Sequence, residues 1–228
     1  MKVMILAAGR GERMRPLTDR LPKPLVEAGG KPLIAWHLER LAAAGFREAV
    51  INVAHLGEQL VERIGDGSAF GIAVVWSREA EPLETAGGLA WARALLGEAP
   101  FLLVNSDVYC EYDFRALRER ALGAMLAHLV LVPNPPHRPG GDFSLASEQV
   151  GNDAAPRYTY SGIALIDPEL YAAVRSGDKA PLAPYLKAAA AQGRLSGELY
   201  RGLWRDVGTA ERLEELRGLL DHRRGGVA

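Results

Sequence analysis

The sequence predicts an α/β protein with a doubly wound, mostly parallel sheet that carries helices on both faces. Short apolar segments alternate with amphipathic segments along residues 1–132, at spacings typical of βαβ units. The first apolar segment leads directly into a glycine-containing loop, at the strand end where ligands bind in such sheets. After Val132 the alternation gives way to a proline-rich loop.

The expected strands of the first part are short and apolar, whereas the expected helices carry apolar residues on one face. Proline in the first turn marks the start of the first expected helix, and glycine just past the last turn marks its end. We expect strands at Lys2–Ala7, Ala49–Val53, Ile72–Trp76, Phe101–Val104 and His128–Val132. We expect helices at Pro32–Ala44, Gly57–Ile64, Gly88–Leu96 and Asp113–Leu122.

The second part is expected to elaborate the same domain rather than to form another. Its expected strands are Asp142–Leu145, Arg157–Ile166 and an edge strand at Gly197–Tyr200. Its expected helices are Pro181–Ala191 and Thr209–His222, the latter with Thr209 as N-cap. We therefore expect one domain over 1–228, made of a core (1–132), a ligand-binding part (133–206) and a closing helix with a tail (207–228).

The composition is that of a globular enzyme. The 228 residues can bury a large core, and 48% hydrophobic residues is ordinary. A net charge of −1 argues against a protein that binds nucleic acid through a basic surface. The single cysteine, Cys110, permits no internal disulfide and fits the cytoplasm. We expect no signal peptide or membrane span, because the first apolar segment is only a few residues long.

Cations gather in the loop that follows the first expected strand. Gly9 and Gly11 let backbone N–H groups approach a phosphate closely, while Arg13 and Lys23 supply positive charge. Prolines on both sides of Lys23 restrict its backbone. The Lys-Ser or Lys-Thr pair of a Walker loop is absent, and Met14 replaces the third glycine of a dinucleotide fingerprint. The loop thus indicates a nucleotide-phosphate site; the alternative is a solvated basic loop.

Two carboxylates that are distant in the sequence are candidates for a Mg²⁺ site. Asp107 follows the expected strand Phe101–Val104 closely, and Asp206 lies between a strand-like segment and the last helix. Mg²⁺ prefers oxygen ligands and keeps several waters, so that two carboxylates make a dedicated site. We expect Asp107 and Asp206 to converge on one ion. The alternative is a turn or a helix cap for Asp107 and a helix cap for Asp206.

Four parts of the chain resemble the signature of the sugar-1-phosphate nucleotidylyltransferases. They are Leu6–Thr18 with Pro22–Leu25, Glu81–Gly88, Leu103–Val108 and Trp204–Thr209, in that family's order over nearly the whole chain. The resemblance implies a Rossmann-like nucleotidyltransferase fold and Mg²⁺ as cofactor. It implies a nucleoside triphosphate and a sugar 1-phosphate as substrates, with pyrophosphate released. Within the family it favours UTP and N-acetylmuramate 1-phosphate, and hence a role in peptidoglycan recycling.

The resemblance also implies roles for individual residues. Arg13, Lys23 and Asp107 are expected to be catalytic, with Arg13 on the β- and γ-phosphates and Lys23 on the α-phosphate or the acceptor phosphate. The residues expected at the nucleotide are Gly9, Gly11, Glu12, Arg13, Lys23, Glu81 and Gly87. Those expected at the sugar phosphate are Asn105, Asp142, Glu148 and Gly162. For Asp142 and Glu148, a solvated loop charge is the alternative.

The expected chemistry follows from charge. A sugar 1-phosphate is an already ionised nucleophile, so that positioning and electrostatic stabilisation are the main catalytic tasks. An alternative within the class is transfer from GTP to mannose 1-phosphate. An alternative from another class is a nucleotide-sensing module on the same fold. An NAD-dependent oxidoreductase is disfavoured by Met14.

The chain departs from the family's pattern in its second half. Many relatives carry a Glu-Lys-Pro motif whose lysine touches the phosphates, whereas residues 147–150 and 155–157 contain no lysine here. Phosphate neutralisation is then expected to depend more on Lys23, Arg13 and the metal, unless Arg157 substitutes. Long relatives continue into a repeat domain used in assembly or acetyl transfer. This chain ends after the closing helix, so we expect a monomer or small homo-oligomer.

Overall fold

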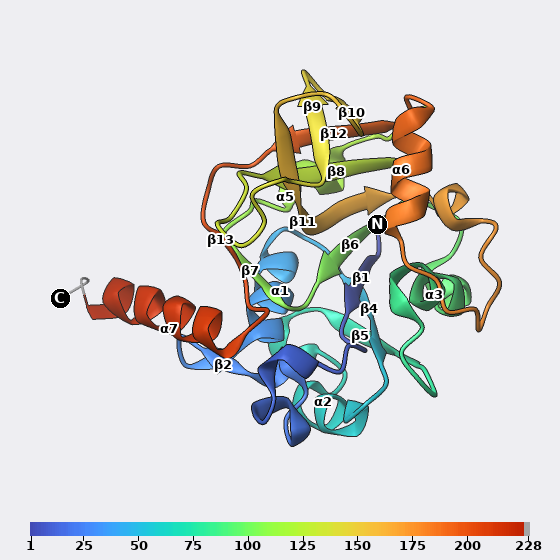
Figure 1. Cartoon of the computed structure of the whole chain (residues 1–228). Helices are drawn as coiled ribbons and strands as arrows, with labels where there is room; N and C mark the ends of the chain where they lie inside the picture. The colour runs from blue at the N-terminus through green and yellow to red at the C-terminus, as the bar shows by residue number, and fades with distance from the viewer. Residues whose placement is uncertain (226–228) are drawn as a thin grey trace.

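Thirteen strands lie in the part of the chain that the computed structural model describes, which is residues 1–225, with side chains for residues 1–223. They are β1 (Val3–Leu6), β2 (Glu27–Ala28), β3 (Lys31–Pro32), β4 (Glu48–Val53), β5 (Ala73–Arg78), β6 (Phe101–Asn105), β7 (Val108–Cys110), β8 (Ala127–Val132), β9 (Phe143–Ala146), β10 (Gln149–Gly151), β11 (Arg157–Ile166), β12 (Leu195–Leu199) and β13 (Trp204–Asp206). Nine of them form one sheet in the order β5-β4-β1-β6-β11-β8-β12-β10-β9 (Figure 1). β13 pairs with β7, and β2 pairs with β3.

Seven α-helices and five short 3-10 helices lie in the described part of the chain. The α-helices are α1 (Leu33–Ala43), α2 (Gly57–Ile64), α3 (Glu84–Trp91), α4 (Arg93–Leu96), α5 (Arg115–Glu119), α6 (Ala183–Ala191) and α7 (Ala210–Gly225). The short 3-10 helices are η1 (Glu12–Met14), η2 (Leu17–Asp19), η3 (Lys23–Leu25), η4 (Ser68–Phe70) and η5 (Pro168–Tyr171). In the described part of the chain, no helix combines the length and the apolar character that a bilayer crossing requires.

The sheet is parallel in one half and mixed in the other. β5, β4, β1 and β6 run parallel, as βαβ units require. β11 is antiparallel to both β6 and β8, β12 is parallel to β8, and β10 is antiparallel to β9. The α/β fold class is confirmed. The mixed half arises because β9, β10 and β11 follow one another through short connections, which leave no room for a crossover helix.

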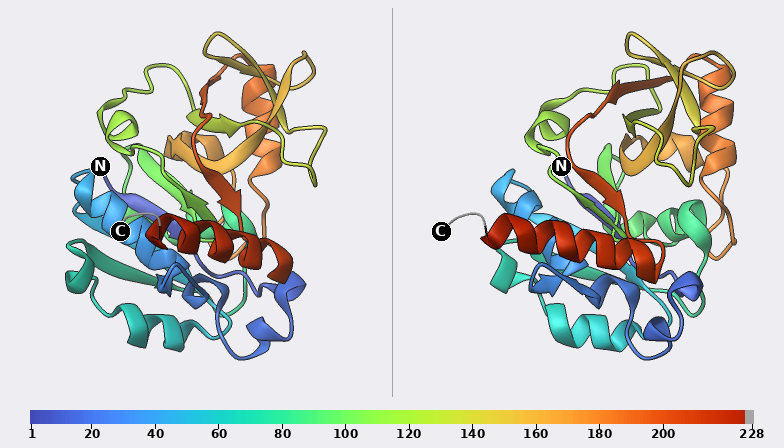
Figure 2. Two further views of the ribbon diagram at one scale, coloured as in Figure 1. Left: turned by 90° about the vertical axis from the view of Figure 1, so that its left-hand side faces the viewer. Right: turned by 60° about the vertical axis from the view of Figure 1, so that its left-hand side comes forward.

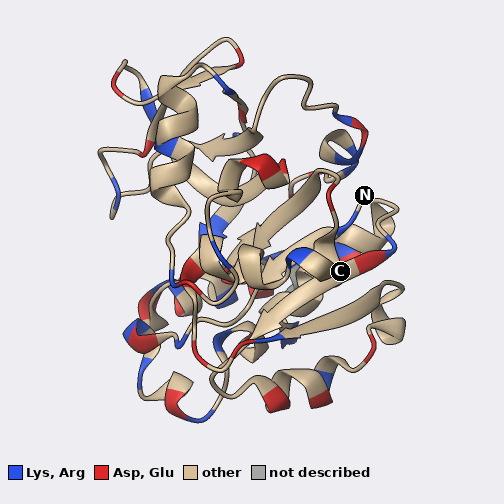
Figure 3. Cartoon of the chain, turned by 90° about the vertical axis from the view of Figure 1, so that its right-hand side faces the viewer, with Lys and Arg blue, Asp and Glu red and all other residues tan. Residues whose placement is uncertain are grey.

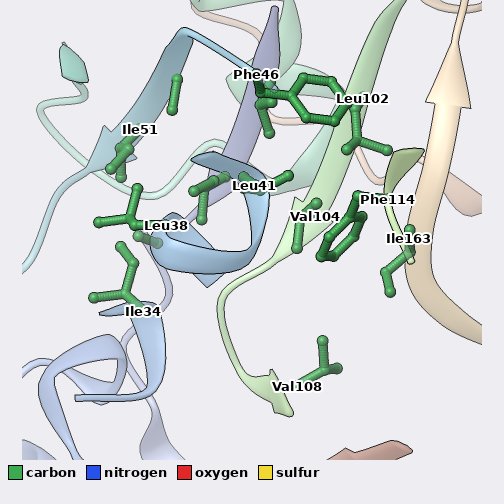
Figure 4. Packing of buried hydrophobic residues seen from close by; sticks show 14 of the residues in the cluster. Ile34, Leu38, Leu41, Phe46, Ile51, Leu102, Val104, Val108, Phe114 and Ile163 are labelled. Carbon is green, nitrogen blue, oxygen red and sulfur yellow. The ribbon is translucent and has the colours of Figure 1, made fainter. Parts of the chain in front are cut away.

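Alternating side chains of the central strands build two cores, one on each face of the sheet. In β1, for example, Val3 and Ile5 belong to one cluster and Met4 to the other. Helices α1, α2 and α5 contribute to the first cluster, and α3, α4 and α6 contribute to the second. Figure 4 shows Leu38 and Leu41 of α1 within the first cluster. The expectation of helices on both faces is therefore confirmed.

Helix α7 covers the N-terminal loops rather than the main sheet (Figure 2). Its apolar residues Leu213, Leu216 and Leu220 pack with Met14 and Val26, which flank the cationic loop segment. The N-cap expected at Thr209 is present, since the backbone N–H of Arg212 donates to its hydroxyl at 3.3 Å. The closing helix thus braces the loop that holds the expected phosphate ligands.

Several boundaries differ from the sequence expectations. The helix expected at Gly88–Leu96 begins at Glu84 and is divided into α3 and α4, so that Gly87 lies inside α3. The low helix propensity of its two glycines concealed that start. The segment expected as an edge strand is β12, which lies between β8 and β10. α7 extends to Gly225, past His222, and residues 226–228 of the expected tail lie outside the described residues.

A buried histidine ties α1 to β7. His37 is only 1% exposed, and its Nε2 lies 2.7 Å from the carbonyl oxygen of Val108, the residue after Asp107. Burial lowers the pKa of His37 from 6.5 to about 4, so that the ring is neutral at neutral pH and Nε2–H donates this bond. The bond holds the strand that follows Asp107.

We predict that His37 makes the fold sensitive to acid. The unfolded chain takes up the proton before the folded chain does, so that the stabilisation is present above pH 6.5 and is lost as the pH falls toward about 4. His37→Gln keeps an N–H donor but does not titrate, so it should reduce the slope of the free energy of unfolding against pH by up to about 1.4 kcal/mol per pH unit. Urea unfolding at several pH values in this window measures that slope. Equal slopes for the two proteins would contradict the assignment.

Candidate active site

A cleft of about 830 Å³ opens where the parallel strands β1, β4, β5 and β6 end. Because these strands are neighbours, the loops after them meet at one edge of the sheet. Charged residues lie mostly on the loops and helices around the sheet (Figure 3). Of the residues expected at the nucleotide, those that line the cleft are Gly9, Gly11, Glu12, Arg13, Lys23 and Glu81.

An ion pair joins two of the loops. Lys23 Nζ donates to Asp107 Oδ2 at 2.6 Å, and the lysine side chain is only 10% exposed. β1 and β6 pair in a register that sets Leu6 opposite Asn105, so the loops carrying the two charges start side by side. The flanking prolines and η3 present Lys23 from a tight turn. The structure thus brings two of the expected catalytic residues into direct contact.

The glycines of the loop after β1 serve different purposes. Gly11 has a φ of +64°, and a Cβ there would lie 2.8 Å from Thr18 Cγ2. The Thr18 hydroxyl donates to the Gly11 carbonyl at 2.8 Å, which folds the loop onto itself. Around Gly9, by contrast, nothing lies within 4 Å of where a Cβ would be. Gly11 is therefore required for the shape of the loop, and Gly9 leaves room for a ligand.

Arg13 reaches the loop from the following 3-10 helix, η1. A Cβ on Gly208 would lie 3.2 Å from Arg13 Nη2, so the guanidinium lies beside the segment that follows β13. Arg13 therefore stands where the N-terminal loop and residues 206–209 approach one another.

A buried polar chain forms the floor of the cleft. Asn52 accepts from the Ala7 N–H at 2.8 Å and donates to Glu79 Oε1 at 2.7 Å. Glu79 Oε2 accepts from the Leu83 N–H at 3.0 Å. Burial raises the pKa of Glu79, against the opposing effect of these two hydrogen bonds. The sequence analysis missed both side chains, although each lies at or directly after the end of an apolar strand.

Gly88 leaves space beneath α3 for these hydrogen-bonded polar groups. A Cβ at this position would lie 2.9 Å from Glu79 Oε1 and 3.0 Å from Asn52 Nδ2. The glycine therefore serves the floor of the cleft rather than a ligand.

The two aspartates expected to share a metal lie on adjacent backbone segments but line different cavities. The Val207 N–H donates to the Asp107 carbonyl at 2.7 Å. The Asp206 carboxylate instead contacts Arg212 Nη1 at 2.5 Å and His137 Nε2 at 3.2 Å. Asp107 lines the cleft, whereas Asp206 lines a second cavity. The two backbone segments are hydrogen-bonded to each other, but a shared cation would require Asp206 to turn away from Arg212.

The donor chemistry of this pair fits Mg²⁺. Both groups are carboxylates, which hard divalent cations prefer. Among the described residues, no group of three or more His, Cys, Asp or Glu side chains gathers in a way that could hold a metal. Phosphate oxygens and water would therefore have to complete the coordination shell, as Mg²⁺ sites at nucleotides commonly allow.

Of the residues expected at the sugar phosphate, Asn105 lines the cleft and Gly162 supports it. Asn105 ends β6. Gly162 has a φ of +82°, and a Cβ there would lie 2.7 Å from Asn105 Nδ2. Gly162 thus gives the Asn105 side chain its space.

Asp142 and Glu148 do not line the cleft. Asp142 accepts from the Tyr160 N–H at 2.9 Å and pairs with Arg138 at 3.3 Å. Glu148 is exposed and pairs with Arg120 at 3.1 Å. The structure gives both carboxylates local partners in place of the sugar contacts that the resemblance implied.

Gly87 acts on the cleft indirectly. Its N–H donates to the Ala180 carbonyl at 3.1 Å, and the Ala180 N–H donates to the Leu83 carbonyl at 3.0 Å. A Cβ on Gly87 would lie 2.3 Å from the Asp178 carbonyl oxygen. Gly87 therefore lets the loop around Lys179 lie against α3, and Gly87 itself is not part of the cleft lining.

The contact between α3 and the loop around Lys179 brings to the cleft a cation that the sequence analysis missed. Among the described residues, Lys179 is the cation from the second half that lines the cleft. Arg157 does not line it, since its guanidinium donates to the carbonyls of Asn152 and Asp142. Of these two second-half cations, Lys179 lines the cleft and Arg157 does not.

Comparisons with known proteins agree with this geometry. A family model described as "Nucleotidyl transferase" matches residues 2–143. Over 226 residues the chain is 51% identical to an N-acetylmuramate alpha-1-phosphate uridylyltransferase of Neisseria meningitidis serogroup B, covering 96% of this chain and 98% of the relative. Over 122 residues it is 45% identical to a mannose-1-phosphate guanyltransferase of Yarrowia lipolytica. That match covers 52% of this chain and only 34% of the guanyltransferase.

Solved structures share the fold. A putative glucose-1-phosphate thymidylyltransferase from Bacillus anthracis superposes with a TM-score of 0.85 at 20% identity, covering 96% of this chain and 95% of the other. An apo UDP-glucose pyrophosphorylase does so with a TM-score of 0.77 at 16% identity, covering 98% of each chain. With the family model spanning more than half of its length, the chain belongs to the nucleotidyl transferase family.

Proposed function

We propose that this chain transfers a uridylyl group from UTP to N-acetylmuramate 1-phosphate and releases pyrophosphate. The observation that carries the proposal is the cleft in which Lys23, Asp107 and Arg13 come together. The likeness to the N. meningitidis enzyme over nearly the whole chain supports the choice of substrates. We assign the nucleotide to residues 1–132 and the sugar phosphate to residues 133–206 of one domain, 1–228.

The reaction needs no strong general base. An ionised phosphate oxygen of the sugar 1-phosphate forms a bond to the α-phosphorus, while the bond from that phosphorus to the pyrophosphate oxygen breaks. The obstacle is the repulsion between two anions and the charge that builds on departing pyrophosphate. Cations that are already in position lower both costs.

Lys23 would exchange partners when the substrates bind. A buried ammonium without a counter-charge is costly, so Asp107 compensates it in the free protein. The α-phosphate or the acceptor phosphate would take over Lys23, while Arg13 would bind the β- and γ-phosphates as a planar fork. Asp107 would then be released, and together with Asp206 it would hold Mg²⁺, which would neutralise charge on the phosphates.

The remaining lining residues suit the nucleoside and the phosphate path. Gly9, Gly11 and Glu12 border the loop where backbone N–H groups can meet phosphate. Glu81 and Glu84 line the cleft at the start of α3, where we place the base. Glu84 has a φ of +61°, a strained conformation for a residue other than glycine.

We also place the enzyme in the cytoplasm. Cys110 is a buried free thiol, as expected in a reducing compartment.

The substrate assignment predicts the outcome of a substrate panel. Pyrophosphate release is measured for each nucleoside triphosphate with a set of sugar 1-phosphates, in the presence of Mg²⁺. We expect the highest kcat/KM with UTP and N-acetylmuramate 1-phosphate. A preference for GTP and mannose 1-phosphate would change the assignment to guanylyl transfer. No turnover by the folded protein across the panel would support a nucleotide sensor instead.

Lys23 and Asp107 should be essential for turnover. Lys23→Ala removes the cation from the reacting phosphate and should lower kcat/KM by about 10²–10³-fold, the range found for loss of one preorganised electrostatic contact. Asp107→Asn should abolish the response of the rate to Mg²⁺ concentration. The matched control is Lys31→Ala, which removes a half-buried lysine that pairs with Glu39 and does not line the cleft; this variant should leave the rate unchanged. An unchanged kcat/KM in Lys23→Ala would exclude Lys23 from the reaction.

Lys179 should contribute to substrate binding through the position that Gly87 gives it. Lys179→Ala should lower kcat/KM by about tenfold, as expected for loss of one charge-assisted contact. Gly87→Ala should reproduce this defect, because the new methyl group would push the Asp178 carbonyl off α3. The exposed Lys187 of α6 provides the control, Lys187→Ala. Wild-type kinetics in Lys179→Ala would remove the residue from the site.

A further inference from the structure

Both aspartates of the proposed Mg²⁺ site are paired with a cation of the chain itself. Lys23 Nζ lies 2.6 Å from Asp107 Oδ2. Arg212 Nη1 lies 2.5 Å from Asp206 Oδ2. Only 10% of the lysine side chain and 15% of the arginine side chain are exposed, so that solvent screens neither ion pair fully. A divalent cation must therefore compete with two charges that the fold already holds in place.

Arg212 is fixed by its own surroundings. It lies in the first turn of α7, where its backbone N–H and its Nε–H both donate to Thr209 Oγ1 at 3.3 Å. The guanidinium also lies against the preceding backbone, because a Cβ on Gly208 would come within 2.3 Å of Arg212 Nη2. An arginine held in this way loses little further freedom when it binds a carboxylate. Its pair with Asp206 is therefore more favourable than one formed by a mobile surface side chain.

The contact with Arg212 holds the Asp206 carboxylate at the second cavity. β13 is antiparallel to β7 with Asp206 opposite Val108, the residue after Asp107, so that the backbone already brings the two aspartates together. Asp206 nevertheless lines the second cavity, of about 700 Å³, where His137 Nε2 lies 3.2 Å from Oδ1. The direction of one side chain, rather than the path of the backbone, thus keeps Asp206 from the cleft.

The two ion pairs differ in what can reach them. Lys23 and Asp107 both line the cleft, so a phosphate of the nucleotide could take the place of Asp107. Arg212 lines the second cavity instead. A divalent cation that binds both aspartates without nucleotide would leave Lys23 and Arg212 without a counter-charge, which is unfavourable for partly buried groups. With the nucleotide, phosphate neutralises Lys23, and phosphate oxygens add ligands to the ion.

We propose that Arg212 is a positioning residue that withholds Asp206 from the metal site, so that the two aspartates alone do not hold a divalent cation and the ion binds together with the nucleotide. The inference rests on the proposed function, in which these aspartates hold Mg²⁺. The role of Arg212 is to direct the Asp206 side chain, and it requires no contact with the ion or the nucleotide.

Binding of Mn²⁺, a paramagnetic substitute for Mg²⁺, tests this role without turnover. Electron paramagnetic resonance measures free Mn²⁺ in titrations of the nucleotide-free protein. We expect Arg212→Gln to bind Mn²⁺ at least about tenfold more tightly than the wild type, because a charge-assisted contact no longer competes for Asp206. Arg212→Lys, which keeps a cation at this position, should retain most of the weak wild-type affinity.

A double-mutant cycle shows whether Arg212 acts through Asp206. In an Asp206→Asn background, Arg212→Gln should change the Mn²⁺ affinity by less than about twofold, since the ligand that it withholds is gone. The matched control is Arg205→Gln, which removes from the same cavity a guanidinium that donates to the Trp204 carbonyl at 2.8 Å. This control should keep the wild-type affinity. Circular dichroism and the unfolding midpoint show whether each variant is folded.

The outcomes separate this inference from the proposed function. Equal Mn²⁺ affinities of the wild type and Arg212→Gln overturn the positioning role. A gain that persists in the Asp206→Asn background, or that Arg205→Gln reproduces, also overturns it, because Arg212 would then act through its charge alone. A wild-type protein that retains no Mn²⁺ even with UTP, and releases no pyrophosphate in the substrate panel, overturns the proposed function instead.

Discussion

The ion pair between Lys23 and Asp107 connects the strand register to the chemistry of the cleft. It forms because β1 and β6 are parallel neighbours and end opposite one another. Three further contacts hold it: the turn of η3 around Lys23, the hydrogen bond from Val207 to the Asp107 backbone, and the bond from His37 to Val108. A shift of one residue between these strands would reverse the side-chain directions and separate the two charges.

The floor of the cleft is rigid for a related reason. Each buried polar group needs a partner, and the chain from Ala7 through Asn52 and Glu79 to Leu83 supplies one for each. Because every link joins a different loop, the ends of β1, β4, β5 and the start of α3 are held relative to one another. Lys23, by contrast, has one ionic partner, Asp107, which a phosphate would replace under the proposed function. The site would thus combine a fixed floor with an exchangeable ion pair.

The sequence predicted the features that depend on strand ends, because apolar segments and the polar residue after each of them are visible locally. Asp107 is such a residue, and Lys23 could be placed through its two prolines. Glu148 shows the limit, since its partner Arg120 comes from a distant part of the chain. Lys179 could not be predicted, because only the contact of its loop with α3 brings it to the cleft. The interior position of β12 was missed for the same reason: β9 and β10 extend the sheet beyond it.

Asp206 links the two cavities through charge. In the free protein its carboxylate neutralises Arg212 and contacts His137 on the side of the second cavity. If it joins Asp107 at a cation, as proposed, Arg212 loses its counter-charge in a partly buried position, where an unpaired charge is unfavourable. A phosphate of the acceptor beside Arg212 would restore that balance. Binding of the metal-bound nucleotide should therefore favour binding of the acceptor, and by linkage the acceptor should favour the nucleotide to the same extent.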